Sequence, residues 1–224
     1  MKGFLITFEG TEGSGKSTQI RLLEKRLVSL NFSVQVVREP GGTPIGEEIR
    51  HTLKHSAQNA DMTPETELLL VNASRAQLVR QIIRPALDRG EFVLCDRYYD
   101  STVAYQGYGR GLDLPVAQSI IDFAVGPTRP DLTFFLHLAQ ELSAERVQKR
   151  NVAGNSLRDR MEEADREFFS RVECGYIEIA RKDPARVKRI DAGRSVSEVE
   201  QLIWEKVQLL LDSALADRKR RTGG

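Results

Sequence analysis

The sequence predicts an α/β fold, a doubly wound parallel sheet of five strands flanked by helices. Short runs of apolar and β-branched residues alternate along the chain with stretches of helical periodicity, and this alternation is typical of right-handed βαβ units. Several runs are apolar throughout, which indicates strands that are covered on both faces. The predicted strands lie at residues 4–9, 33–37, 92–95, 132–138 and 186–190.

Helical patterns fill the intervals between these strands. They lie near residues 16–30, 44–55, 63–88, 115–124, 141–150, 161–181 and 196–216. The segment 148–162, QKRNVAGNSLRDRME, is basic, contains few large apolar residues and interrupts two of these patterns. We interpret it as a mobile loop or small lid over a site, and such sites lie beyond the carboxyl ends of the strands in this fold.

Composition and charge limit the class of protein. We expect one domain over residues 1–224, because 224 residues with 40% hydrophobic content fit a single large domain. The formal net charge of +1 gives no large field to attract nucleic acid or an anionic membrane. No apolar run reaches the ~18 residues of a membrane span, and the N-terminus lacks signal-peptide features.

Cysteine use and the C-terminus complete this picture. Cys95 and Cys174 are far apart and lack metal-ligand spacing, which indicates free thiols in a reducing compartment. We therefore expect a cytoplasmic protein. The basic RKRR at 218–221 lies in a segment, about 217–224, that we interpret as a solvated, disordered tail.

A phosphate-binding loop follows the first predicted strand. GTEGSGKS, residues 10–17, matches the pattern G-x-x-x-x-G-K-S. In this pattern glycines let backbone N–H groups point at phosphate oxygens, the lysine (Lys16) reaches the terminal phosphates, and the serine (Ser17) supplies a hydroxyl to Mg²⁺. Its place between a strand and a helix predicts the P-loop NTPase fold and a bound nucleoside triphosphate with Mg²⁺. The predicted ATP-binding residues are Gly10, Thr11, Glu12, Gly13, Ser14, Gly15, Lys16, Ser17 and Thr18.

Several classes of protein carry such a loop. A GTPase would need a base-reading N-K-x-D motif, which the sequence lacks. A small kinase needs a second anion site, an acceptor pocket and a basic lid, and the remaining sequence offers residues for all three. A P-loop switch and a catalytically silent nucleotide-binding module stay as alternatives. The silent module is disfavoured, because Lys16, Ser17 and Arg97 are all present.

The stretch LCDRYYDSTVAYQ, residues 94–106, follows the third predicted strand and is rich in polar groups. Asp96 is placed to hold Mg²⁺ through water or to orient a neighbouring base, and Arg97 can bind a phosphate with two hydrogen bonds. Upstream, Arg38 precedes a Pro-Gly-Gly turn and could face an anionic substrate. Neutral donors and acceptors for a nucleotide are spaced along one side of a helical turn: Ser101, Thr102, Tyr105 and Gln106.

Motifs in this order resemble the bacterial thymidylate kinases. They are FEGTEGSGKST, REPGGT, SRAQ, DRYYDSTVAYQGYGRG, RPDLTFFL and DRME, and the resemblance runs from about residue 3 to about 215. It implies phosphoryl transfer from ATP to dTMP with Mg²⁺ as cofactor, and a homodimer.

The resemblance also implies roles for single residues. Glu12 would approach the 3′-hydroxyl of the acceptor sugar, and Arg38 and Arg97 would bind its 5′-phosphate. Arg75 would hydrogen-bond thymine. Thr102, Tyr105 and Gln106 would line the base and the sugar, with Tyr105 crowding the 2′ position. Candidates for the catalytic lid arginine are Arg150, Arg158 and Arg160, of which Arg160, in DRME, has the clearest motif match.

Two features depart from the family pattern. Val71 stands where the family usually has a phenylalanine that stacks on thymine. We expect the stacking to be lost or to come from Tyr98 or Tyr99, and a nucleoside monophosphate kinase with a shifted base preference stays open. The lid stretch RNVAGNSLRDR is also slightly long for the bacterial pattern.

Overall fold

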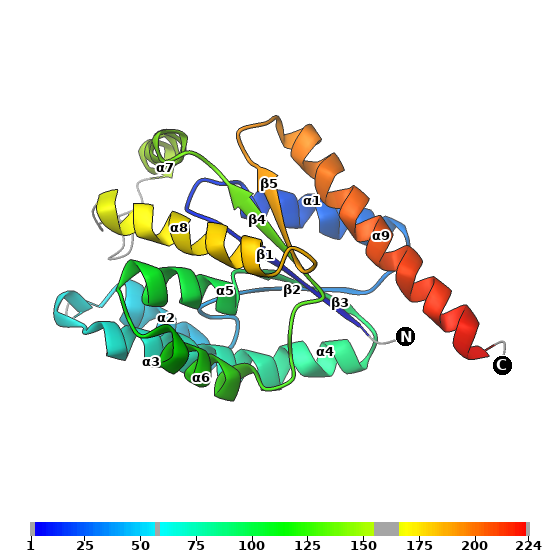
Figure 1. Ribbon diagram of the computed structural model, residues 1–224, viewed down its shortest axis with the longest axis horizontal. Helices are drawn as coiled ribbons and strands as arrows, with labels where there is room; N and C mark the ends of the chain where they lie inside the picture. The colour runs from blue at the N-terminus through cyan, green and yellow to red at the C-terminus, as the bar shows by residue number, and fades with distance from the viewer. Residues whose placement is uncertain (1–2, 57–58, 155–165, 223–224) are drawn as a thin grey trace.

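A computed structural model describes residues 3–56, 59–154 and 166–222 (Figure 1). Its five-stranded sheet has the order β2-β3-β1-β4-β5, and every strand pair is parallel. The strands are β1 (Phe4–Glu9), β2 (Val34–Arg38), β3 (Phe92–Asp96), β4 (Leu132–His137) and β5 (Val187–Asp191). The predicted sheet is therefore confirmed, and its strand boundaries lie within a residue or two of those expected.

Helices connect all of these strands. They are α1 (Lys16–Ser29), α2 (Pro44–Lys54), η1 (Asn59–Asp61), α3 (Pro64–Leu78), η2 (Val79–Ile83), α4 (Arg84–Asp88), α5 (Tyr99–Thr102), η3 (Val103–Gly109), α6 (Leu114–Val125), α7 (Gln140–Gly154), α8 (Arg166–Lys182) and α9 (Val196–Thr222). No helix within the described residues is long and apolar enough to cross a membrane.

Local sequence explains where several helices begin. Thr43 and Thr63 precede Pro44 and Pro64, and each threonine side chain accepts a hydrogen bond from a backbone N–H of the first helical turn. Proline at the first helical position costs no hydrogen bond, and a capping hydroxyl satisfies a donor that the helix leaves free. These Thr-Pro pairs therefore begin α2 and α3.

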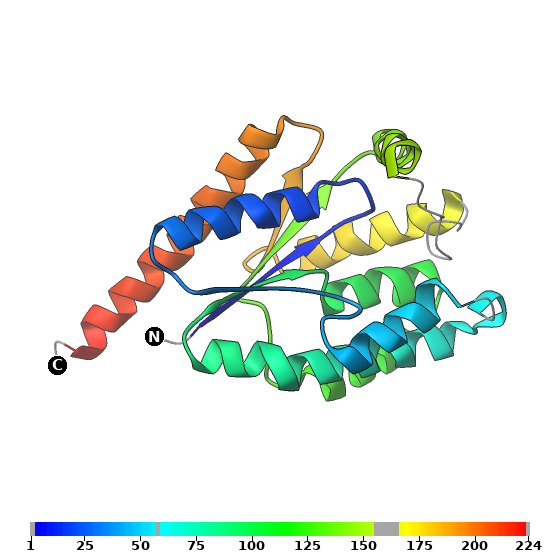
Figure 2. The same ribbon diagram turned by 180° about the vertical axis from the view of Figure 1, so that it is seen from behind.

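The sheet separates two layers of helices. Helices α1 and α9 cover one face (Figure 2), and their side chains pack there on Phe8 and Phe134. Helices α3, α6 and α8 cover the opposite face, which carries Leu5, Val93 and Phe135. Side chains alternate across the sheet with a period of two, so one strand contributes to both cores. The carboxyl ends of β1, β2 and β3 meet at one edge and leave room there for a site.

Some predicted boundaries differ from the observed ones. The helix expected over 63–88 is continuous but contains a π-helical turn, η2. Residues 148–154 of the predicted lid belong to α7, and residues 155–162 lie outside the described part of the chain. Helix α9 reaches Thr222 rather than ending near 216, so most of the segment for which we predict a disordered tail is helical. The polar, charged residues of these two segments led us to expect a loop and a tail, whereas α7 and α9 continue through them.

Candidate active site

A cleft of about 550 Å³ lies at the carboxyl edge of the sheet. The phosphate loop forms one side of it, and α3, the stretch after β3 and α8 form the other. It brings together most of the predicted site residues: Glu12, Gly13, Gly15, Lys16, Ser17, Thr18, Arg38, Val71, Arg75, Asp96, Arg97, Ser101, Thr102, Tyr105 and Gln106.

The phosphate loop has the backbone shape that its glycines predict. Gly10, Gly13 and Gly15 all have positive φ, a region that glycine enters without strain. A β-carbon at Gly10 would also collide with the carbonyl oxygen of Leu136. Of the predicted ATP-binding residues, Gly10, Thr11 and Ser14 do not line the cleft. The side chains of Thr11 and Ser14 are buried, and Ser14 Oγ donates to the Thr11 carbonyl (2.8 Å).

Lys16 is buried across this loop. Its Nζ donates to the carbonyl oxygens of Gly10 (3.1 Å) and Thr11 (3.0 Å). Burial, with help from the charge of Arg97, lowers the pKa of Lys16 to about 8, and nearby carboxylates such as Asp96 oppose the change. A buried cation with this environment would gain strongly from an anionic partner, so the loop favours a phosphate at this point.

Two hard oxygen donors lie at the rim of the loop. Ser17 Oγ donates to Asp96 Oδ2 over 3.0 Å. A hydroxyl and a carboxylate suit Mg²⁺, which takes few protein ligands and completes its shell with water and phosphate oxygens. Among the described residues, no group of three or more His, Cys, Asp or Glu side chains could hold a metal ion. The donor set therefore fits an ion that enters with a nucleotide.

Arg97 occupies a strained turn directly after β3. Its φ is 70°, a conformation that is uncommon outside glycine and is often found at functional sites. Its Nη1 donates to Ser101 Oγ and to the Tyr176 hydroxyl, each over 3.3 Å, and its Nη2 lies 3.7 Å from Glu12 Oε1. The guanidinium also lies over the Tyr105 ring, 5.1 Å from its centroid. Side chains from four segments thus hold one cation in the cleft.

The buried carboxylate of Glu9 supports this turn from below. Glu9 Oε1 accepts from the backbone N–H of Tyr98 (2.7 Å), and Oε2 accepts from Ser101 Oγ (2.5 Å) and the Tyr176 hydroxyl (2.9 Å). Burial and the charge of Asp100 raise the pKa of Glu9 to about 7, although its hydrogen-bond donors oppose the rise. Glu9 therefore fixes both the backbone after Arg97 and two of the groups that Arg97 contacts.

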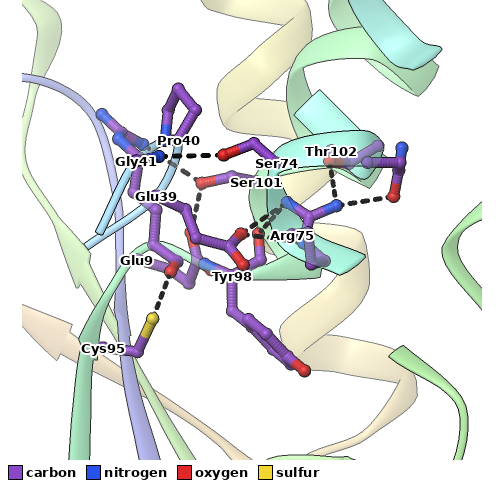
Figure 3. A network of polar contacts seen from close by, with 12 residues as sticks. Glu9, Glu39, Pro40, Gly41, Ser74, Arg75, Cys95, Tyr98, Ser101 and Thr102 are labelled. Carbon is purple, nitrogen blue, oxygen red and sulfur yellow. Dashed lines mark hydrogen bonds and ion pairs between the residues drawn. The ribbon is translucent and has the colours of Figure 1, made fainter. Parts of the chain in front are cut away.

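Arg75 projects from α3 (Figure 3), and its side chain is almost fully buried. Its Nε donates to Glu39 Oε2 (2.8 Å), its Nη1 donates to Asn72 Oδ1 (2.8 Å) and Thr102 Oγ1 (2.9 Å), and its Nη2 donates to the Tyr98 carbonyl (3.2 Å). Burial raises the pKa of Glu39, while Arg75 opposes the rise. All three guanidinium nitrogens thus donate to protein acceptors. A bound base could accept a hydrogen bond from Arg75 only alongside one of these acceptors or in its place.

Gln106 lies on the cleft wall and is 2% exposed. Its Nε2 donates to Glu67 Oε1 over 2.7 Å. Glu67, from α3, is fully buried and also accepts from Arg110 Nε (3.3 Å) and Nη2 (3.0 Å). The Arg110 guanidinium lies 4.6 Å from the centroid of the Phe168 ring. A charged pair therefore holds the amide of Gln106 in one orientation.

The suggestion that Tyr98 or Tyr99 stacks on a base is wrong. The Tyr98 ring is fully buried and its hydroxyl donates to the Thr128 carbonyl (3.1 Å). Tyr99 lines a different pocket, against Arg129 and Arg186. The helix that begins at Tyr99 turns both rings toward the core. The predicted lid arginines Arg158 and Arg160 lie outside the described residues, as does the side chain of Arg150.

Sequence reasoning missed several residues of the cleft. They are Glu39, Arg50, Lys54, Arg146 and Phe169. Arg146 donates to the carbonyls of Gly13 (3.3 Å) and Ala192 (3.2 Å) and so reaches over the phosphate loop. Phe169 lies on α8, beyond the predicted lid. Helical periodicity places both residues on helices, but no motif marks them as facing the phosphate loop.

This fold and this cleft define a P-loop phosphotransferase, and comparisons with known proteins narrow the class. A sequence profile of the family "Thymidylate kinase" matches residues 8–203. The thymidylate kinase of Syntrophotalea carbinolica is 46% identical over 202 residues, which cover 90% of this chain and 93% of that protein. The thymidylate kinase of Deinococcus radiodurans is 46% identical over 206 residues, 92% of this chain and 97% of that protein.

A solved structure agrees with these sequence matches. The crystal structure of thymidylate kinase from Ehrlichia chaffeensis superposes with a TM-score of 0.73 at 33% identity, covering 92% of this chain and 99% of the other. The chain belongs to the thymidylate kinase family, whose members are nucleoside monophosphate kinases. The resemblance that the sequence motifs indicated is confirmed.

Proposed function

We propose that the protein transfers the terminal phosphoryl group of ATP to the 5′-phosphate of dTMP, giving dTDP and ADP. One observation carries the proposal: a single cleft is lined both by the phosphate loop with Lys16 and by the partly buried, pre-positioned Arg97. Two anion-binding groups on opposite walls suit a donor phosphate and an acceptor phosphate. Membership of the family supports the choice of dTMP as acceptor.

The donor nucleotide would occupy the phosphate loop. Backbone N–H groups of residues 10–18 and the ammonium of Lys16 would bind its phosphates. Ser17 and Asp96 would hold Mg²⁺ at the rim. When bound, the ion neutralises part of the charge on the phosphate oxygens. Arg146, which already donates to the Gly13 carbonyl of the loop, would close over the donor.

The acceptor phosphate would lie against Arg97. Arg38, its predicted partner, is half-exposed and pairs with Glu47 over 2.9 Å, so binding would draw it from one carboxylate to a phosphate. Tyr105 packs under the Arg97 guanidinium and is 6% exposed. It would crowd the 2′ position of the sugar, while Glu12 would approach the 3′-hydroxyl.

Transfer would need positioning and charge stabilisation rather than a general base. The acceptor phosphate is largely a dianion at neutral pH, since its second pKa lies near 6, so it is already a nucleophile. An in-line approach between the two walls of the cleft places attacking and leaving oxygens on opposite sides of the transferred group. Lys16, Arg97 and a lid arginine, Arg160 or Arg150, would stabilise its charge. Lid closure would exclude water.

The base would lie between α3 and η3, against Val71, Thr102 and Gln106. Phe169 is the aromatic side chain of the cleft that comes from α8 and could supply apolar contact in place of the family phenylalanine. A nucleoside monophosphate kinase with broader base preference is the second candidate, and the valine at position 71 favours it.

We also propose that the protein works in the cytoplasm as a homodimer. An apolar surface on α3 and α6 supports self-association: Leu69 is 56% exposed, Val116 56% and Phe123 82%. Exposed apolar side chains on neighbouring helices are typical of protein interfaces. Light scattering behind size exclusion would report about twice the 25.2 kDa mass of one chain, and a monomer at micromolar concentration would contradict the dimer.

A coupled ADP-release assay tests the activity. The reaction would contain ATP, Mg²⁺ and one of dTMP, dUMP, dCMP, UMP, dGMP or AMP. We expect acceptor-dependent ADP with strong preference for dTMP. Comparable rates with several monophosphates would support the second candidate, and ADP that forms without any acceptor dependence would overturn the kinase assignment.

A further inference from the structure

We infer that Glu67, a buried residue outside the cleft, determines which class of base the acceptor site takes. The inference rests on the proposed function and deepens it. Glu67 holds the side-chain amide of Gln106 so that the Gln106 oxygen faces the cleft. This amide oxygen accepts a hydrogen bond and so selects a pyrimidine that carries an N–H at ring position 3. Glu67 is a positioning residue, since it acts through Gln106.

The contacts of Glu67 fix its own chemistry first. It is fully buried, and it accepts hydrogen bonds from Arg110 through both guanidinium nitrogens Nε and Nη2. An arginine guanidinium can only donate hydrogen bonds, and here it donates to both oxygens of the Glu67 carboxyl group. Both Glu67 oxygens therefore act as acceptors toward the groups behind the cleft wall.

The orientation of Gln106 follows from this. An amide has a donor end and an acceptor end, and turning it by half a rotation exchanges the two. Glu67 Oε1 lies 2.7 Å from the nearer end of the Gln106 amide. Only the donor end can face an acceptor at that distance, because two oxygens there would repel. The Gln106 oxygen is therefore turned away from Glu67, and it accepts no hydrogen bond from the described residues.

That oxygen belongs to a side chain of the cleft wall. Thymine and uracil carry an N–H at position 3, which can donate to it. Cytosine has a lone pair at position 3, which would meet the lone pairs of the amide oxygen. A buried acceptor that faces another acceptor makes no hydrogen bond and has also lost its water. The wall therefore accepts one class of pyrimidine and rejects the other.

The support of Glu67 spans several segments. Arg110 follows η3, and its backbone N–H donates to the Tyr105 carbonyl (2.9 Å) while its guanidinium lies over the Phe168 ring of α8. The pair thus joins α3, η3 and α8 behind the base site. Rotation of Gln106 would leave two oxygens facing each other in a buried place, so the selected orientation is the one the fold maintains.

Glu67→Gln and Glu67→Asp test the inference as a matched pair. Glutamine keeps the shape but can present an N–H₂ to Gln106, which lets the Gln106 amide rotate. Aspartate stays an acceptor. The measured quantity is the ratio of kcat/KM for dUMP to that for dCMP, since neither substrate has the 5-methyl group. We expect a ratio of at least about 100 in the natural protein, about tenfold less in Glu67→Gln, and a change below about threefold in Glu67→Asp.

The outcomes separate this inference from the proposed function. A Glu67→Gln protein that loses activity toward both substrates equally, with an unchanged ratio, would overturn the role of Glu67 alone. Absence of dTMP-dependent ADP in the natural protein would overturn the proposed function. If Glu67→Gln does not fold, calorimetric titration of the natural protein decides: dUMP should bind at least about tenfold more tightly than dCMP, and equal affinities would contradict the inference.

Discussion

The two walls of the cleft are constructed in different ways. The donor wall is a local structure, in which residues 10–18 supply backbone N–H groups, one lysine and one hydroxyl. The acceptor wall is assembled from side chains of α3, of the stretch that follows β3, of η3 and of α8. Buried glutamates hold three of its groups: Glu9 supports the Arg97 turn, Glu39 pairs with Arg75, and Glu67 orients Gln106.

This difference shows that a fold can position polar side chains through buried partners from distant parts of the sequence, as well as through a local loop. A buried carboxylate is costly unless it is paired, so each of the three glutamates commits its partner to one geometry. The phosphate loop needs no such support because its glycines determine its shape. The donor wall should therefore respond to changes in one short segment, and the acceptor wall to changes at buried positions far from the ligand.

Loss of the Lys16 cation should have the largest effect. In Lys16→Ala we expect kcat to fall about 10³-fold, because the proposed neutralisation of the terminal phosphates by its ammonium group would be lost. Steady-state ADP release measures this. The dissociation constant for dTMP should stay within about threefold, which calorimetry would show. Preserved turnover would remove Lys16 from the mechanism.

Arg97→Ala should impair the use of dTMP without affecting ATP binding. We expect kcat/KM for dTMP to fall about 10²- to 10³-fold, since a desolvated, charge-assisted contact with the phosphate is lost. Arg97→Lys keeps the charge but not the paired hydrogen bonds, so it should recover part of the loss. ATP affinity should change little in both variants. A parallel loss of ATP binding would mean that the two walls are not separate.

Glu9 should make stability depend on pH. Its pKa is about 7 in the folded protein against an ordinary value of 4.5, so the folded state holds this proton more tightly than the unfolded state. Stability from Glu9 is therefore lost as pH rises from about 4.5 to 7, by up to about 3 kcal/mol. Glu9→Gln cannot ionise. Urea unfolding should show the variant gaining stability relative to the natural protein over that interval, and a constant difference would contradict the shifted pKa.

Val71→Phe should give the smallest change. A ring at the cleft wall can stack on the base, which is worth about 0.5–1.5 kcal/mol, so KM for dTMP should fall about three- to tenfold. Val71→Leu adds volume without a ring and serves as the control. An equal effect in both variants would attribute the gain to packing rather than stacking.

The sequence predicts the donor wall better than the acceptor wall, for a physical reason. The phosphate loop is a local motif, so strand, glycines and lysine stand together in the chain. The stretch after β3 also marked Arg97, Ser101 and Gln106, because polar residues follow a buried strand there. Phe169, which lines the cleft, and Tyr176, which contacts Arg97, come from α8, about 70 residues later. Their positions depend on how α8 packs, which residue spacing does not encode.

The buried glutamates were missed for the same reason. Glu39 precedes a Pro-Gly-Gly turn and Glu67 stands in a predicted helix next to another polar residue, Thr66, and both resemble ordinary surface acids in the sequence. The structure shows them 5% and 0% exposed. The wrong assignment of Tyr98 and Tyr99 has a related origin, since the π-helical turn η3 and the start of α5 decide which side chains of that stretch face the cleft.

The most direct measurement is calorimetric titration of dTMP and dCMP into the protein without ATP. If the buried glutamates hold the acceptor wall in its binding geometry, dTMP should bind in the absence of ATP. The affinity for dCMP should then be at least about 100-fold weaker. Failure of dTMP to bind until ATP is present, or equal binding of the two nucleotides, would contradict a pre-formed acceptor wall.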